Sequence, residues 1–201
     1  AFSGKTVTTI CDLSCLTYPE FHPAKRVTWF KFFADRMAKS DHIITISNYS
    51  KGEIVRYLGV AEERVTVTYL AASNNFYPEE INEQGKCYLQ SKFNIIQPYF
   101  LSVGTVEPRK NLMCLLKAYS IFRKKHSDTD VDLVIVGCNG WLNKDIYQYV
   151  NECKMQRFVK FLGYVSEDEL RQQKKNTQAF VYPSIYEGFG LPPLEAMACG
   201  T

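Results

Sequence analysis

The chain has 201 residues, of which 46% are hydrophobic and 22% are charged, the composition of an ordinary globular protein with one large or two small domains. Its net charge of +3 does not indicate nucleic-acid binding, and no apolar stretch approaches the ~18 residues needed to span a bilayer. Seven cysteines without a Cys-x-x-Cys pair predict free thiols and a cytoplasmic location.

The first third of the chain alternates strands with helices. Strand patterns occupy residues 7–10, 42–46 and 64–70, and helical patterns occupy residues 24–39 and 50–58. Ser50 and Glu53 fit a capping box at the start of the second helix, and Gly59 fits its end. This segment therefore predicts one α/β block.

A polar, turn-rich segment at residues 71–98 interrupts the alternation and predicts a domain crossing. The predicted organisation is a first domain over residues 1–75, a linker over 76–98 and a second domain over 99–201. The chain begins with Ala1 and stops after an apolar helix, where a further strand is expected. The sequence therefore predicts a fragment of a longer chain, with both domains incomplete.

The second block alternates in the same way. Strand patterns occupy residues 99–103, 131–136, 158–162 and 179–182, with helices expected after Asn111, over residues 145–154 and after Ser166. Such alternation predicts a doubly wound parallel sheet whose ligand lies beyond the carboxyl ends of the strands. No Gly-x-Gly-x-x-Gly follows the first strand, which argues against a dinucleotide site.

Two glutamates flank a glycine turn that runs into a helix near the end of the chain. Gly188 and Gly190 permit a sharp turn, and the proline pair after Leu191 suits the first turn of a helix. Amides at a helix start attract phosphate, so Glu187 and Glu195 would border a site for a nucleotide sugar. Taken singly, each glutamate also fits a loop charge or an acid favoured by the helix dipole.

A second phosphate element follows the strand at residues 99–103. Its loop begins at Gly104, which allows a turn, and carries Arg109 and Lys110 at the carboxyl edge of the predicted sheet. A guanidinium and an ammonium there can neutralise a diphosphate. A solvated Arg-Lys pair is the alternative interpretation.

Together these motifs resemble the retaining family 4 glycosyltransferases, the glycosyl transferases group 1, whose GT-B fold has two Rossmann-like domains. Within that family the chain is most similar to bacterial enzymes of O-antigen and exopolysaccharide assembly, many of them mannosyltransferases. The resemblance covers nearly the whole chain. It is carried by residues 9–14, 41–50, 76–78, 102–111 and 187–201.

The resemblance implies a role for each residue of the two motifs. Glu187 would be the catalytic residue near the donor sugar, and Glu195 would accept hydrogen bonds from the ribose. Cys11 and Thr105 stand where many relatives have His and Arg. The donor-binding residues would be Gly104, Thr105, Arg109, Lys110, Gly188, Phe189, Gly190, Leu191 and Glu195.

The implied reaction is a metal-independent hexosyl transfer with retention and without a cofactor. The donor would be a nucleoside-diphosphate sugar, with mannose as the best assignment. The acceptor would be a glycan or a lipid-linked oligosaccharide of bacterial surface polysaccharide synthesis. Two alternatives are a truncated, non-catalytic nucleotide-sugar-binding fragment and a GT-B-type sugar-nucleotide epimerase, which would need a paired acid and base that the sequence does not show.

The helix at residues 24–39 mixes aromatic and basic side chains. Trp29, Phe30, Phe32 and Phe33 lie among lysines and arginines, as in helices that bind the cytoplasmic face of a membrane. The alternative is a core helix with one solvated face. The expected partners are therefore a nucleotide sugar, a glycan or lipid-linked acceptor and a peripheral membrane contact, without nucleic acid.

Overall fold

The computed structural model describes residues 4–79, 83–96 and 98–201. Contacts between residues divide it into two compact units. Unit 1 comprises the residues up to Ala71 together with Tyr186–Gly190, and unit 2 comprises Ala72–Ile185 and Leu191–Thr201. The turn that carries Glu187 therefore belongs to unit 1, whereas the loop that carries Lys110 belongs to unit 2.

Unit 1 contains a three-stranded parallel sheet in the order β1 (Val7–Thr9), β2 (His42–Thr45) and β3 (Val65–Val67). Between β1 and β2 lie α1 (Ser14–Thr17), η1 (Pro19–Phe21) and α2 (Ala24–Ala38). Between β2 and β3 lie α3 (Asn48–Leu58) and η2 (Glu62–Arg64). The core consists of the buried side chains of Ile10, Leu13, Ile43, Ile54, Val60 and Val65.

The start of α3 differs from the sequence prediction. The N-cap is Ser47, whose side-chain oxygen accepts a hydrogen bond from the Ser50 amide at 3.0 Å. The predicted capping box of Ser50 and Glu53 is therefore wrong, because both residues already lie inside the helix. The predicted end is confirmed: Gly59 adopts a left-handed conformation with φ of 63°.

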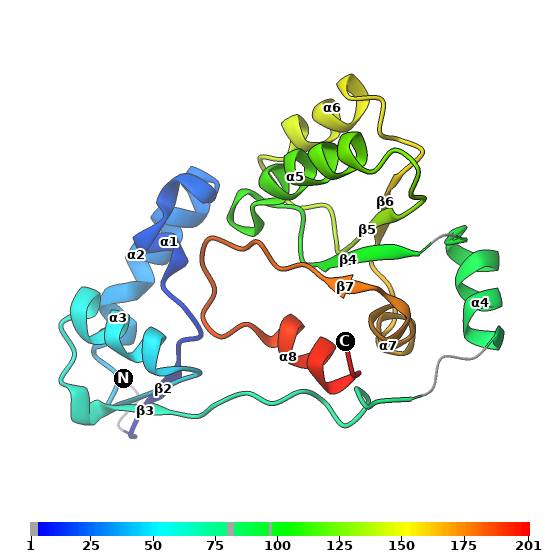
Figure 1. Ribbon diagram of the computed structural model, residues 1–201. Coiled ribbons are helices and arrows are strands. Elements are labelled where there is room, and N and C mark those ends of the chain that lie inside the picture. Colours follow the sequence, from blue (N-terminus) through cyan, green and yellow to red (C-terminus); the bar gives the residue numbers. More distant parts are fainter. Residues whose placement is uncertain (1–3, 80–82, 97) are drawn as a thin grey trace. The chain divides into compact units, whose positions relative to one another are not determined.

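Unit 2 contains a four-stranded parallel sheet, and Figure 1 shows its central strands running side by side. The order is β6 (Val159–Gly163), β5 (Asp132–Val136), β4 (Tyr99–Val103) and β7 (Ala179–Phe180). The predicted parallel sheet is confirmed. Because β5 and β6 lie on one side of β4 and β7 on the other, the strand order reverses at β4, which is the topological switch point of the sheet.

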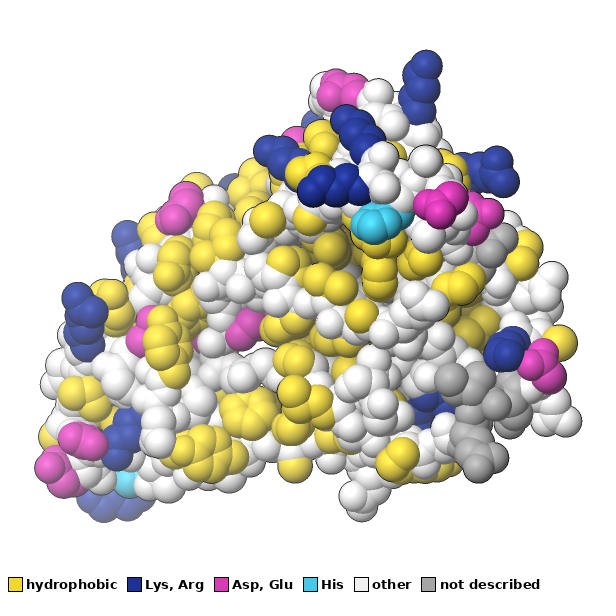
Figure 2. Space-filling view, viewed as in Figure 1, with side chains coloured by type: hydrophobic (Ala, Val, Ile, Leu, Met, Phe, Trp, Pro, Cys, Tyr) yellow, Lys and Arg dark blue, Asp and Glu magenta, His cyan; other side chains and the backbone are white. Residues whose placement is uncertain are grey.

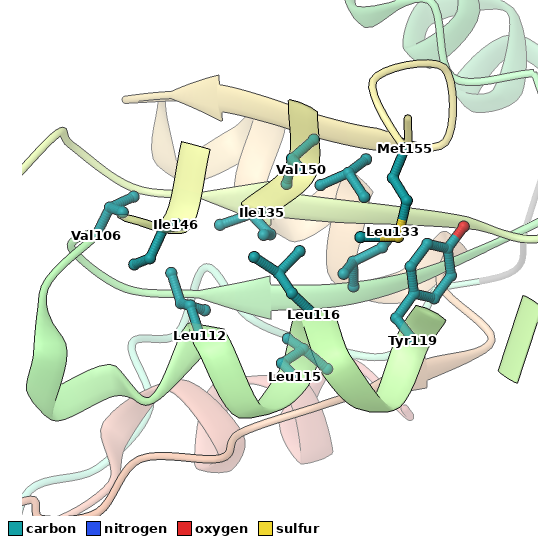
Figure 3. Close-up of a cluster of buried hydrophobic side chains, with 11 residues drawn as sticks. Val106, Leu112, Leu115, Leu116, Tyr119, Leu133, Ile135, Ile146, Val150 and Met155 are labelled. Atoms are coloured by element: carbon teal, nitrogen blue, oxygen red, sulfur yellow. The ribbon is translucent and has the colours of Figure 1, made fainter. Parts of the chain in front are cut away.

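Helices cover both faces of this sheet, and β5 alternates between them. Leu133 and Ile135 pack against α5 (Leu112–Lys125) and α6 (Lys144–Glu152), in the cluster of Figure 3. Val134 and Val136 pack on the opposite face with Leu89 of α4 (Glu83–Phe93) and Leu170 of α7 (Glu167–Asn176). Every residue of β5 is buried, including Asp132 at its start, and the apolar run at residues 133–136 predicts this for the rest of the strand.

Local signals predict most helix boundaries in unit 2. Ser166 and Glu169 form the predicted capping box at the start of α7. Asn111 precedes α5 as predicted, but its side chain caps no helix amide and donates instead to the Pro183 carbonyl at 3.1 Å. α4 lies where the sequence predicts no helix. The last helix, α8 (Leu191–Ala198), begins at the predicted leucine-proline sequence.

Candidate functional site

The loops that follow β4 and β7 lie next to each other in unit 2. The Ile185 amide donates to the Arg109 carbonyl at 2.9 Å, beside the hydrogen bond from Asn111 to Pro183. Both loops leave the carboxyl ends of adjacent strands at the switch point, which is where open α/β sheets bind ligands. The structure therefore brings the predicted phosphate loop and the end of β7 into one site.

Lys110 extends over the backbone of Gly104. A Cβ atom on Gly104 would lie 2.9 Å from Cε of Lys110, so a side chain there would displace the lysine, and the φ of +153° favours glycine. The ammonium lies 3.5 Å from the Tyr182 hydroxyl and 5.4 Å from the centre of that ring. Thr105 follows Gly104 and is half-buried. Lys110 and Thr105 thus both belong to the loop at the switch point.

Arg109 binds a carboxylate that the sequence did not single out. Its Nε and one terminal nitrogen donate to Oε1 of Glu107, at 3.1 and 2.7 Å. The Glu107 side chain is almost completely buried, so this ion pair ties the guanidinium to the loop interior. Among the described residues no hydrogen-bond partner reaches Oε2 of Glu107. The signal available in the sequence was a glutamate two residues before the Arg-Lys pair.

Glu195 of α8 also has a buried partner, Lys174 of α7. Their side chains form a hydrogen-bonded ion pair, with the lysine completely buried and the glutamate side chain 14% exposed. The Lys174 ammonium lies 4.5 Å from the ring centre of Phe76 and 5.8 Å from that of Phe180. Burial lowers the pKa of Lys174, and the bond to Glu195 opposes that shift. Sequence reasoning missed Lys174, because a lysine within the charged sequence of α7 reads as a solvated side chain.

The predicted glycine turn is held in unit 1 by the start of α3. The carbonyl of Gly188 accepts hydrogen bonds from the hydroxyls of Ser47 and Ser50, at 2.5 and 3.2 Å. A Cβ on Gly188 would overlap the carbonyl oxygen of Cys11, and it would come within 3.1 Å of Cβ of Asp12. Only glycine allows this contact.

Tyr186 anchors the same turn. Its hydroxyl bonds to the buried carboxyl group of Glu53 and accepts a hydrogen bond from the Leu13 amide at 3.2 Å. Burial raises the pKa of both Tyr186 and Glu53. Glu187, the next residue, is half-buried. The turn is therefore fixed on both sides of Glu187.

The other predicted residues are distributed between the two units. Phe189 of unit 1 lies 6.4 Å from the Tyr69 ring, and Gly190 has a φ of 99° that favours glycine. Leu191 begins α8 in unit 2, one turn before Glu195. The structure thus assembles two groups of predicted residues: Glu187, Gly188, Phe189 and Gly190 in unit 1, and Gly104, Thr105, Arg109, Lys110, Leu191 and Glu195 in unit 2.

The described residues contain no group of three or more His, Cys, Asp or Glu side chains placed to hold a metal ion. Asp128, Asp130 and Asp132 form an Asp-x-Asp pattern at the amino end of β5. That end is opposite to the carboxyl edge where the two loops lie. Over the ranges that the structure describes, no helix has the length and apolar character to cross a bilayer.

Comparison with known proteins identifies the family. The family model described as glycosyl transferases group 1 matches residues 90–201. O-antigen chain mannosyltransferase B of Escherichia coli is 36% identical over 199 residues, which are 98% of this chain and 51% of that protein. O-antigen chain mannosyltransferase RfbU of Salmonella typhimurium is 31% identical over 96% of this chain and 49% of its own.

Solved structures show the same fold. Anabaena Alr3699/HepE, crystallised with UDP and glucose, superimposes with a TM-score of 0.74 at 20% identity, over 97% of this chain and 50% of that one. The protein is thus an α/β protein of the GT-B class, with Rossmann-like units built on parallel sheets. It belongs to the glycosyl transferases group 1 family. The chain spans about half the length of the curated relatives it matches.

Proposed function

We propose that this chain is part of a retaining glycosyltransferase that uses a nucleoside-diphosphate sugar. Mannose is the proposed sugar, and a glycan or lipid-linked oligosaccharide of bacterial surface polysaccharide synthesis is the proposed acceptor. Family membership and the similarity to O-antigen mannosyltransferases support this assignment.

The observation that carries the proposal is the pairing of the loops after β4 and β7 at the switch point. Lys110 lies over Gly104 in that pair, and we assign it to the diphosphate, whose charge an ammonium neutralises as a point charge. Arg109 shares this task while its bond to Glu107 sets the loop conformation. Thr105 and the Gly104 backbone complete the phosphate side of the site.

The start of α8 supplies the second half of the donor site. The backbone amides of Gly188 to Leu191 are assigned to the phosphate and the sugar hydroxyls, because amides at a helix start favour negative charge. Glu195 is assigned to the ribose hydroxyls, which a carboxylate binds by accepting their hydrogen bonds. The ion pair with Lys174 orients the Glu195 carboxylate for that contact.

The proposed chemistry is a displacement at the anomeric carbon on one face of the sugar. The bond to the diphosphate oxygen breaks, the acceptor oxygen forms the new bond on the same face, and a phosphate oxygen takes the acceptor proton. Lys110 and the helix amides stabilise the charge that develops on the leaving diphosphate. Glu187 is assigned to the sugar, where positive charge develops. We propose that this reaction needs no metal ion.

We also propose a peripheral membrane contact through α2. Trp29 and Phe32 are 61% and 60% exposed, and the Arg36 guanidinium lies 4.8 Å from the Phe32 ring centre. Phe30 and Met37 instead pack on the core, so the helix has one buried and one aromatic-basic face. Figure 2 shows hydrophobic side chains at the surface over this helix. Flotation with anionic liposomes tests the contact: wild type should float, and recovery only in the soluble fraction would end the idea.

The donor assignment is tested by titrating the full chain with GDP and UDP at low salt. Lys110→Ala should weaken nucleoside-diphosphate binding by roughly 1.5–3 kcal/mol, the value of a hydrogen bond to a charged group. Lys117→Ala is the matched control, because Lys117 is an exposed lysine of α5. Equal affinity of the wild type and Lys110→Ala would refute the assignment.

A further inference from the structure

Unit 1 contains a groove that none of the assigned site residues line. Its volume is about 670 Å³, and it is lined by Thr17, Tyr18, Asn48, Tyr49, Gly52, Glu53, Arg56 and Tyr57. Six of these eight residues belong to one face of α3, and the other two lie at the end of α1. Pockets of roughly 300–1,000 Å³ are the usual size for small ligands.

The lining of the groove combines aromatic faces with short polar groups. Tyr49 is 57% exposed and Tyr57 46%, so both rings present surface to a ligand. Glu53, Arg56 and Asn48 supply a carboxylate, a guanidinium and an amide. Tyrosine offers an apolar ring and a polar tip, and charged groups make the stronger hydrogen bonds. This combination suits a ligand whose rings have apolar faces and whose edges carry hydroxyls.

The charge of the groove favours a neutral ligand. The lining residues include one cationic side chain, Arg56, one acidic side chain, Glu53, and no lysine. The Arg56 guanidinium lies 5.2 Å from the centre of the Tyr57 ring. A phosphate-binding site would instead show an excess of cations. A saccharide matches the groove better than a nucleotide does.

Gly52 keeps the floor of the groove open. It lies in the middle of α3, where glycine costs roughly 0.5–1 kcal/mol relative to alanine. A Cβ atom on Gly52 would have no described heavy atom within 4 Å, and its φ is not in the left-handed region. Neither packing nor backbone conformation therefore requires glycine here. A side chain at this position would occupy the groove.

The groove is joined to the turn that carries Glu187. The centre of the Tyr186 ring lies 5.2 Å from the centre of the Tyr18 ring and 5.8 Å from that of the Tyr49 ring. The Tyr186 hydroxyl donates a hydrogen bond to the Glu53 carboxylate. All three partners line the groove. Glu187 is the next residue, about 3.8 Å further along the chain between Cα atoms. A ligand in the groove would thus contact the residues that hold the candidate catalytic glutamate in place.

We propose that this groove binds the sugar end of the acceptor glycan, with pyranose rings against the tyrosines and hydroxyls bonded to Arg56 and Asn48. The inference rests on the proposed glycosyltransferase function, and it adds the acceptor subsite to it. Gly52 is a specificity-determining position, because its missing side chain leaves room for a sugar ring.

The test is a two-dimensional NMR titration of the full chain with methyl glycosides of mannose, glucose, galactose and N-acetylglucosamine. At least one glycoside should shift the amide signals of Gly52 and Tyr57 saturably. Gly52→Gln should weaken that binding by about tenfold or more, because the side chain fills the groove. Its melting temperature should not fall, since glutamine is a better helix former than glycine. Lys51→Gln, on the same helix outside the groove, should bind as the wild type does.

A GDP titration of the same samples separates this inference from the proposed function. If GDP binds but no glycoside shifts the groove signals, or if Gly52→Gln binds the glycoside as tightly as the wild type, the acceptor subsite is wrong and the donor site stands. If neither GDP, UDP nor any glycoside binds, both the subsite and the proposed function are wrong. Loss of glycoside binding in Gly52→Gln alone, with GDP binding kept, supports the subsite.

Discussion

The ion pair between Lys174 and Glu195 leads to a quantitative prediction. Lys174→Met removes a completely buried ammonium that lies near the Phe76 and Phe180 rings, and it leaves Glu195 without its partner. Breaking a buried pair costs about 3–5 kcal/mol of unfolding free energy. Because the Glu195 side chain is 14% exposed and can gain some water, we expect about 3 kcal/mol.

The double variant Lys174→Met/Glu195→Gln separates the ion pair from packing. Replacing both charges removes the uncompensated group, so the double variant should lose less stability than Lys174→Met alone. Glu195→Gln alone leaves Lys174 buried without its carboxylate. Burial lowers the folded-state pKa of Lys174, so the unfolded state binds the proton more tightly than the folded state. The free energy of unfolding therefore rises as pH increases through the folded-state pKa of Lys174. The defect of Glu195→Gln should therefore shrink at high pH.

Urea unfolding followed by tryptophan fluorescence measures these effects in unit 2. The chain has two tryptophans, and Trp29 is exposed in unit 1, so a Trp29→Phe background leaves Trp141 as the reporter. Two results would refute the reasoning: a stability of Lys174→Met equal to that of the background, or a double variant that loses the sum of the two single effects.

Three further predictions follow from the site geometry. Glu187→Gln should mainly lower kcat, because the sugar changes in the transition state. Glu195→Gln should mainly raise the donor KM, because the ribose does not change during the reaction. Steady-state kinetics with the opposite pattern would reverse the two roles. Burial raises the folded-state pKa of Glu53, so the wild type loses stability as pH rises from 4.5 to that raised value. Glu53→Gln has no carboxyl group to ionise and should therefore become more stable relative to the wild type over this range. Melting temperatures of the two proteins that change equally with pH would contradict this. Gly188→Ala should destabilise the fold by about 1–3 kcal/mol, because its Cβ would overlap the Cys11 carbonyl. Gly52→Ala should stabilise the fold, because glycine is unfavourable inside a helix. A melting temperature equal to that of the wild type would contradict the prediction for either variant.

Local patterns predict the parts of the fold that local physics determines. The buried run of β5, the capping box of Ser166 and the glycine stop at Gly59 each depend on residues within one turn or strand. The doubly wound sheet follows from the order of these elements. α4 was missed because its sequence is mostly polar, with Leu89 and Phe93 as its hydrophobic contacts in this core cluster.

The site required tertiary information that no local pattern contains. The charges and the glycine of the loop were enough to identify Lys110 from the sequence. The ion pairs of Glu107 with Arg109 and of Lys174 with Glu195 are seen only in the folded structure. The same holds for Ser47, whose hydroxyl both caps α3 and holds the Gly188 carbonyl. Sequence patterns identified residues expected to contact the ligand, and the structure adds those that position them.

The central claim is retaining transfer of mannose from a nucleoside diphosphate, and one NMR experiment on the full-length protein tests it most directly. The protein is incubated with GDP-mannose or UDP-sugars and a saccharide acceptor, with EDTA present, and the anomeric signals of the donor and the product are followed over time. We predict that the α-linked mannose of GDP-mannose appears first in an α-linked mannoside, with Lys110→Ala slower than Lys117→Ala. A β-linked first product, an epimerised donor, or no transfer from any donor would contradict the account.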